Sequence, residues 1–340
     1  MTLTARIKLI VQAIVVLGLA ASAHAAEFKL ATVAPENSQW MRDMRAGAAE
    51  IKQRTDGRVI IKLYGGGVMG SDKKVLRKMR TGQLHGGAFT AGSLMEQYPA
   101  LAIYGLPLLF ESLDEVDYLR SQMDARLKQG LEEAGYVSFG FAGGGFAIIM
   151  GNTPVSSLDD LKSKKVWVPE GDTISYAGME ALNLSPVTLP ITDVLTGLQT
   201  GLLDVVATTP LGALVFQWHT KVKYATEVPL VYTMAYIAID KKRFDRISAE
   251  DQAIVADVLG GIYANFEVVN RVDNDKAAQA LADIGIEMVS LRPGQLETWR
   301  GAVEQVNLEL AEDGEFPEDL YKEALALLED YRAQNTGSAD

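Results

Sequence analysis

The sequence predicts an α/β protein built from two lobes joined by hinge strands, and three features of the chain lead to this prediction. Strand-like and helix-like segments alternate over residues 28–135, as they do in mostly parallel sheets covered by helices. The alternation restarts after the glycine run at 143–145, which indicates a second, smaller lobe. A helical pattern without proline then runs from Ser248 to about Ile284. About 35 residues at 1.5 Å per residue make a helix about 50 Å long, more than the width of one small domain.

In the first lobe, strands are expected to alternate with helices that start at capping residues. The first helix is capped by Asn37 or Ser38, the second is opened by Ser71 or Asp72, and the third is capped by Ser112. Gly82 and Gly135 end the second and third of these helices. Runs rich in β-branched and apolar residues predict the strands, at 28–33, 59–64 and 86–90.

The second lobe repeats the alternation in shorter segments. Pro169 ends a strand, and Asp172 caps a helix that runs to about Leu182. Three strands are expected at 166–168, 186–189 and 205–207. One further helix is expected at 192–200. The apolar segments 143–150 and 230–240 are candidates for strands that cross between the lobes. A final helix over 320–331 precedes a polar tail that we expect to be frayed.

The N-terminus is typical of a secretory signal. Arg6 and Lys8 precede a nearly continuous apolar run at 9–21, and the small residues at 23–25 fit a cleavage site. The apolar run is short for a membrane span, so a cleaved signal over 1–25 is favoured over a retained anchor. We therefore expect an exported protein that begins near Ala26.

Composition excludes several classes of site. The chain has no cysteine, which excludes disulfides, thiolate metal sites and a cysteine nucleophile. The formal net charge of −12 argues against nucleic acid as a partner. There is no His-Glu-x-x-His and no Gly-x-Ser-x-Gly motif, so the sequence does not predict an enzyme.

Two weaker motifs have ordinary structural explanations. Gly65, Gly67 and Gly70 match a dinucleotide fingerprint, but the acidic residue expected about 20 positions later is missing. Glu170 and Asp172 could be two cation ligands on one loop, yet a helix cap beside a surface acid explains the pair as well. Neither a cofactor nor a metal is predicted.

A frame of short motifs resembles the DctP-type solute-binding proteins of tripartite ATP-independent periplasmic (TRAP) transporters. Each motif is weak alone, but their order and spacing cover nearly the whole chain after residue 26. Its parts are Asn-Thr-Pro-Val at 152–155, Leu-Asp-Asp-Leu-Lys at 158–162, Lys-Val-Trp-Val-Pro at 165–169, Leu-Gln-Thr-Gly-Leu-Leu-Asp at 198–204 and, earlier, Leu-Pro-Leu-Leu-Phe at 106–110.

The resemblance implies a periplasmic-binding-protein fold of type II-like topology, in which the long helix braces both lobes. It implies lobe I over 26–147 plus about 237–285, lobe II over 148–236 plus about 286–332, and a flexible tail over 333–340. It also implies that a small-molecule ligand is captured in the periplasm and delivered to a membrane permease with a small and a large integral subunit. We expect a monomer. A binding protein for an ATP-driven importer or a sensor is the alternative, and an exported enzyme is the least favoured one.

One residue departs from the family pattern. Where relatives usually carry an arginine that grips a substrate carboxylate, this chain has Trp167. Tryptophan cannot replace the bidentate fork of a guanidinium, and no arginine lies between Arg126 and Arg243. The substitution predicts an apolar, amphipathic or otherwise uncharged ligand. Two alternatives stay open: an amine over Trp167 with Glu170 nearby, and the usual organic acid held by another cation.

The candidate ligand-binding residues are mainly aromatic. Phe216, Tyr232 and Tyr236 could equally fill the core, and the register after Asp204 leaves open which of the two threonines faces the ligand. The full set is Trp167, Phe89, Phe146, Glu170, Thr208, Thr209, Phe216, Trp218, Tyr232 and Tyr236.

Overall fold

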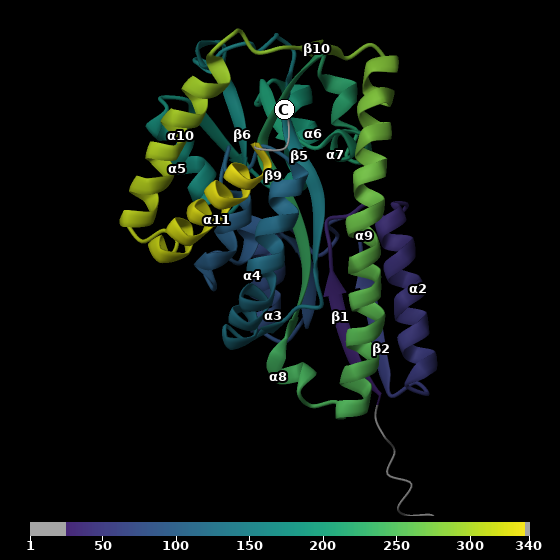
Figure 1. The fold of residues 1–340 in the computed structure, drawn as a ribbon. Helices are drawn as coiled ribbons and strands as arrows, with labels where there is room; N and C mark the ends of the chain where they lie inside the picture. Colours follow the sequence, from purple (N-terminus) through teal and green to yellow (C-terminus); the bar gives the residue numbers. More distant parts are fainter. Residues whose placement is uncertain (1–24, 337–340) are drawn as a thin grey trace, which may run out of the picture.

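The computed structural model describes residues 25–336, so the predicted signal before Ala25 and the last part of the predicted tail lie outside the described residues. The fold is the predicted α/β arrangement of two lobes on one continuous sheet (Figure 1). The sheet order is β2-β1-β3-β9-β5-β8-β6-β7, with β4 and β10 pairing β9. These strands are β1 Ala26–Ala31, β2 Val59–Tyr64, β3 Gly86–Thr90, β4 Tyr136–Val137, β5 Phe141–Gly151, β6 Lys165–Pro169, β7 Ser185–Leu189, β8 Val205–Thr208, β9 Tyr224–Asp240 and β10 Glu287–Val289.

Strands β5 and β9 join the two lobes. They pair antiparallel along most of their length, with Phe146 opposite Tyr232. The C-terminal part of β9 also pairs β3 of the first lobe, and the C-terminal part of β5 pairs β8 of the second. Both predicted crossing segments therefore form strands, and each extends beyond its predicted range.

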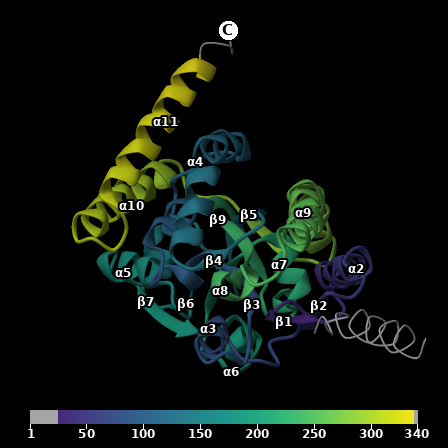
Figure 2. The same cartoon turned by 90° about the horizontal axis from the view of Figure 1, so that it is seen from below.

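Helices cover both faces of the sheet, as Figure 2 shows from below. Each predicted capping serine, Ser38, Ser71 and Ser112, stands at the N-cap of its helix. The helices are α2 Gln39–Arg54, α3 Asp72–Arg80, α4 Leu113–Glu133, α5 Thr173–Ala181, α6 Val194–Thr200, α7 Pro210–Val215, α8 Lys241–Phe244, α9 Ala249–Asp283, α10 Gln295–Glu312 and α11 Glu318–Thr336, with 3₁₀ turns η1 Ala91–Leu94, η2 Pro99–Gly105, η3 Leu158–Leu161, η4 Ile191–Asp193 and η5 Trp218–Lys221.

Helix α9 has the predicted start and length. Ser248 caps it by accepting a hydrogen bond from the Asp251 N–H, and the helix continues for 35 residues. It runs along nearly the full height of the molecule and packs on α2, β5 and α7, so it contacts both lobes (Figure 1). Among residues 25–336 it is the one helix long and apolar enough to cross a membrane by composition. Its Val255, Leu259 and Phe266 belong to the buried core of the first lobe.

The C-terminal helices divide between the lobes. Helix α10 packs on α5 of the second lobe, whereas α11 lies against α4 of the first, where the Tyr118 and Tyr331 ring centroids are 4.8 Å apart. Leu320, Ala324 and Leu328 are buried in the first-lobe core. Because these three residues are buried there, α11 packs on the first lobe, whereas the predicted division of the chain assigns it to the second. The helix also continues to Thr336, so residues 333–336 of the predicted tail are helical.

Candidate functional site

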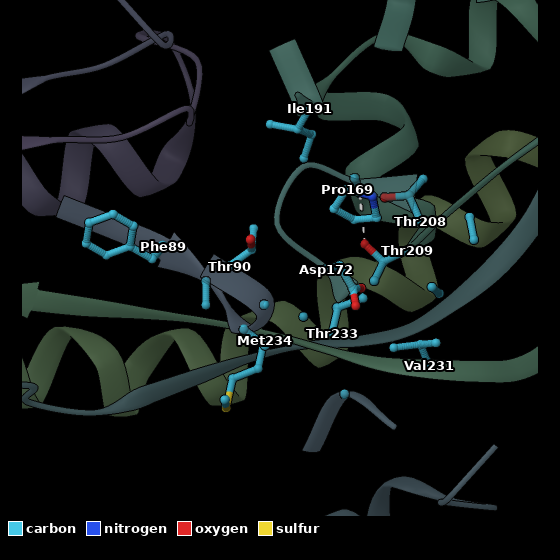
Figure 3. A pocket seen from close by; sticks show the side chains of 18 of the residues that line it. Phe89, Thr90, Pro169, Asp172, Ile191, Thr208, Thr209, Val231, Thr233 and Met234 are labelled. Carbon is cyan, nitrogen blue, oxygen red and sulfur yellow. Dashed lines mark hydrogen bonds between the residues drawn. The ribbon is translucent and has the colours of Figure 1, made fainter. Parts of the chain in front are cut away.

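A cavity of about 370 Å³ lies between the two lobes. Figure 3 shows Phe89 and Thr90 of β3 on one side and Pro169, Thr208 and Thr209 of the second lobe on the other. The crossing strands supply a further part of the wall, including Ala142, Ala147, Val231, Thr233 and Met234. The site is thus built where both lobes and their shared strands meet, as in other two-lobed proteins that close on a ligand.

Most of the wall is apolar, and its polar groups are few. Thr209 caps α7 by accepting a hydrogen bond of 3.0 Å from the Gly212 N–H. Asp172 caps α5 in the same way, accepting 2.9 Å from the Ser175 N–H. Burial raises the pKa of Asp172, against the lowering effect of its hydrogen bonds with Ser175. The side chains are therefore held by helix starts, which fixes their positions in the wall.

Glu170 is the second acid in the wall. Its Oε2 atom is buried and has no hydrogen-bond partner among residues 25–336. A buried carboxylate oxygen without a donor is costly, and a ligand donor would relieve that cost.

No lysine, arginine or histidine belongs to the cavity wall within the described part of the chain. A third acid, Asp72, lies behind Thr90 and accepts hydrogen bonds from the Thr90 N–H and the Ser93 hydroxyl. Burial raises the pKa of Asp72, and the nearby charge of Glu170 adds to the increase. The ionisable carboxyl groups at this site therefore have no basic side chain beside them in the cavity wall as far as the described residues go.

One largely buried guanidinium, that of Arg120, contacts a residue of the cavity wall but is paired with acids behind it. Arg120 of α4 contacts the Tyr232 hydroxyl at 3.1 Å, on a residue that lines the cavity. It also donates to Glu267 of α9 at 2.5 Å, to Asp124 and to the Phe141 carbonyl oxygen. With these acceptors Arg120 forms a network that ties α4, α9 and the crossing strands together behind the cavity.

This network makes stability depend on pH. Burial alone would raise the pKa of Glu267, but Arg120 and hydrogen bonds from Arg120, the Gly143 N–H and Arg271 lower it overall. The folded pKa lies below the unfolded one, so the contribution of Glu267 is complete above the unfolded pKa of about 4.3 and is lost as pH falls through the folded value. We expect Glu267→Gln to lose stability at neutral pH and to show a shallower decline below about pH 5 than the native protein. Urea unfolding at several pH values measures this, and equal slopes would contradict it.

Seven of the ten predicted ligand-binding residues line the cavity. They are Trp167, Phe89, Glu170, Thr208, Thr209, Phe216 and Tyr232. Thr208 and Thr209 both line the cavity, so the sequence register after Asp204 does not have to single out one of them.

The other three predicted residues do not line it. Trp218 is fully buried beneath Trp167 and Phe216, in the core of the second lobe. Tyr236 is buried in the first lobe and packs on Phe89 and Phe141. Phe146 packs edge-on against Tyr232, with ring centroids 6.0 Å apart. Each was placed in the site by its aromatic character, which does not specify the side of a strand or loop.

Trp167 contributes to the wall less than expected. Only 6% of the residue is exposed, and its Nε1–H donates to the Leu189 carbonyl oxygen at 2.9 Å. Its ring meets Trp218 edge-on, with centroids 5.0 Å apart. Most of the indole thus belongs to the lobe core, its one donor is occupied, and the rest borders the cavity.

Several wall residues carried no recognisable signal in the sequence. Trp40 stacks on Phe266 and also borders the cavity. Asn270 comes from the middle of α9, and Met95, Ile174 and Ile191 are ordinary apolar residues. Asp172 is predicted from the sequence as a helix cap or a cation ligand beside Glu170, not as a ligand-binding residue. Their role depends on how distant segments meet, which local patterns do not encode.

Comparisons with known proteins agree on one family. The profile described as "Bacterial extracellular solute-binding protein, family 7" (DctP) matches residues 30–313. The C4-dicarboxylate-binding periplasmic protein DctP of Rhodobacter capsulatus is 24% identical over 276 residues, covering 78% of this chain and 82% of that relative.

Solved structures share the fold. A TRAP periplasmic solute-binding protein from Xanthobacter autotrophicus Py2, with bound β-D-galacturonate, has a TM-score of 0.80 at 21% identity, covering 88% of this chain and 99% of that one. One from Sulfurospirillum deleyianum, with bound succinate, has a TM-score of 0.80 at 17% identity, covering 89% and 99%. At this identity the likeness supports the two-lobed fold.

Proposed function

The chain belongs to family 7 of the bacterial extracellular solute-binding proteins, the DctP family, and we propose that it captures a small, uncharged amphipathic molecule. Members of this family are binding proteins rather than enzymes. The observation that carries the proposal is the wall of the cavity, which contains apolar groups, hydroxyls, one side-chain amide and acids and, within residues 25–336, no positive side chain.

The charge of the wall disfavours a carboxylate ligand. A carboxylate placed in this cavity would lose its hydration without gaining a cation, and it would lie near Glu170 and Asp172. Relatives with bound galacturonate or succinate hold acids, but they share only 17–21% of their residues with this chain. Burial of apolar surface contributes about 25 cal/mol per Å², so a largely apolar ligand needs no ion pair to bind.

A cationic amine is the second candidate, and one atom favours it. The buried Oε2 of Glu170 has no hydrogen-bond partner in the described part of the chain. An ammonium group placed beside Glu170 would satisfy that oxygen and be attracted by Asp172.

Capture would follow from the two lobes. A ligand that contacts both lobes shifts the population towards the closed form, because only that form makes both sets of contacts. The closed protein would act in the periplasm and deliver its ligand to the membrane components of a TRAP transporter, as the family implies.

Head-group preference tests the proposal directly. Isothermal titration calorimetry at neutral pH compares hexanamide, hexanoate and hexylamine, which share their carbon number and differ in charge. We expect hexanamide to bind more than about tenfold more tightly than hexanoate, which corresponds to about 1.4 kcal/mol. Tightest binding by hexylamine would favour the amine, and tightest binding by hexanoate would reject both candidates.

A further inference from the structure

A second cavity of about 90 Å³ lies against helix α5 and shares part of its wall with the main cavity. Ile174, Ser175 and Met179 of α5 and Ala207 of β8 line both spaces. Gly178 and Leu182 of the same helix line only the second one. We call this second space the α5 chamber. The two spaces are therefore separated by little more than side chains of one short helix.

The chemistry of the α5 chamber is almost entirely aliphatic. None of its lining residues is charged. Its wall includes Leu108, Ile149, Leu161, Val166, Val303 and Val306. Apolar cavities of this kind stay dry and take apolar guests, so water is a poor occupant.

One polar atom in the chamber wall lacks a partner. Trp299 of α10 is 3% exposed, and its Nε1–H has no acceptor among residues 25–336. Asn307, whose side-chain amide also belongs to this wall, donates to the Pro107 carbonyl oxygen at 3.3 Å. Among the described residues that line the chamber, only Ser175, Trp299 and Asn307 carry a polar hydrogen on the side chain, so the space is suited to an apolar guest.

The volume limits the size of the guest. An engineered apolar cavity of about 150 Å³ holds one benzene molecule, so a space of this smaller size suits an alkyl group of about three or four carbon atoms. Met179 lines both the main cavity and the α5 chamber, and it is only partly buried. Its unbranched thioether side chain has three rotatable bonds and adapts easily.

We propose that the ligand is an extended molecule whose polar end lies in the main cavity and whose short alkyl end passes Met179 into the α5 chamber. This inference rests on the proposed function because it requires that one ligand molecule occupies both spaces. It does not depend on the charge of the ligand's head group. The chamber, rather than the main cavity, then sets the chain length that the protein accepts.

A homologous series tests the proposal on the intact chain. Calorimetry follows primary amides from butanamide to decanamide, with the matched alkanoates in parallel. In the native protein, affinity should rise about fourfold per methylene and then level off once the chamber is full. In Gly178→Leu the added side chain fills the chamber, and we expect the rise to end about three methylenes earlier.

The variant should fit, and the chain offers a matched control. A Cβ at Gly178 would meet only Val306 Cγ1, at 3.8 Å, which is ordinary contact. Gly301→Leu makes the same change at an exposed position of α10 with open space around it, and its profile should equal the native one. Val306→Ala enlarges the chamber and should move the levelling point to longer chains.

Two readouts keep this inference separate from the proposed function. Preference for alkanoates over amides would reject the proposed head group, while the effect of Gly178→Leu on chain length would still support the chamber. Identical chain-length profiles in the native protein, Gly178→Leu and Val306→Ala would overturn the chamber, whichever head group binds. Failure of both series to bind would count against both proposals.

Discussion

Replacing Trp167 with alanine is expected to lower the free energy of unfolding by about 3–5 kcal/mol, the usual cost of removing a buried tryptophan from a core. The indole is nearly buried, packs edge-on against Trp218 and donates to the Leu189 carbonyl oxygen. Its removal would leave a hole that extends the main cavity into the lobe. Urea unfolding at neutral pH measures the cost.

Trp167→Phe provides the graded comparison. Phenylalanine keeps an aromatic ring in the core but loses the N–H donor. The Leu189 oxygen still accepts from the Glu170 N–H, so no buried acceptor is left alone. We expect a smaller loss than for alanine, with about 1 kcal/mol of it from the lost hydrogen bond. A cost below about 1 kcal/mol for Trp167→Ala would show that the ring does not belong to the core.

Replacing Arg120 with methionine is expected to cost a similar amount, about 3–5 kcal/mol, because it removes the largely buried cation shared by two partly buried acids. The Arg120 side chain is 12% exposed and bridges Asp124 and Glu267. Glu267 would keep Arg271, whereas Asp124 would keep only its bond from the Tyr104 hydroxyl. The Tyr232 hydroxyl would also lose its hydrogen bond from Arg120. Because Tyr232 lines the cavity, we expect ligand affinity to fall as well as the free energy of unfolding.

Arg126→Met on the same helix is the matched control. Arg126 pairs with Glu323 at 2.8 Å, but these side chains are 51% and 46% exposed. Exposed ion pairs contribute about 0–1 kcal/mol, so this variant should unfold nearly like the native protein. Equal losses in both variants would contradict the account of a buried network, since the two substitutions differ chiefly in burial.

The fold was largely predictable because its signals are local. Ser248 with Asp251, and the lack of proline afterwards, specified the long helix α9 to within a residue at each end. Pro169 and Asp172 marked the end of β6 and the start of α5. The destination of α11 was not predictable in this way. The sequence of its apolar stripe does not specify a partner, and the structure places this stripe against α4.

The site was predictable only in part, for a physical reason. Thr208 and Thr209 follow a strand end that meets the cleft, and both line it. Trp218 and Tyr236 have the same aromatic chemistry as true wall residues but are buried in the lobes. The contribution of Trp40, Asn270 and the α5 chamber arises from contacts between distant segments. No single stretch of the sequence contains that information.

Native mass spectrometry of the freshly purified, exported protein tests the central claim most directly, because it identifies a co-purified ligand without prior choice of a probe. Because the described residues 25–336 bring no positive group to the cavity wall, we predict a molecule that carries no carboxylate and has an apolar end. Recovery of a sugar acid or a dicarboxylate, bound in one copy per chain, would contradict the account.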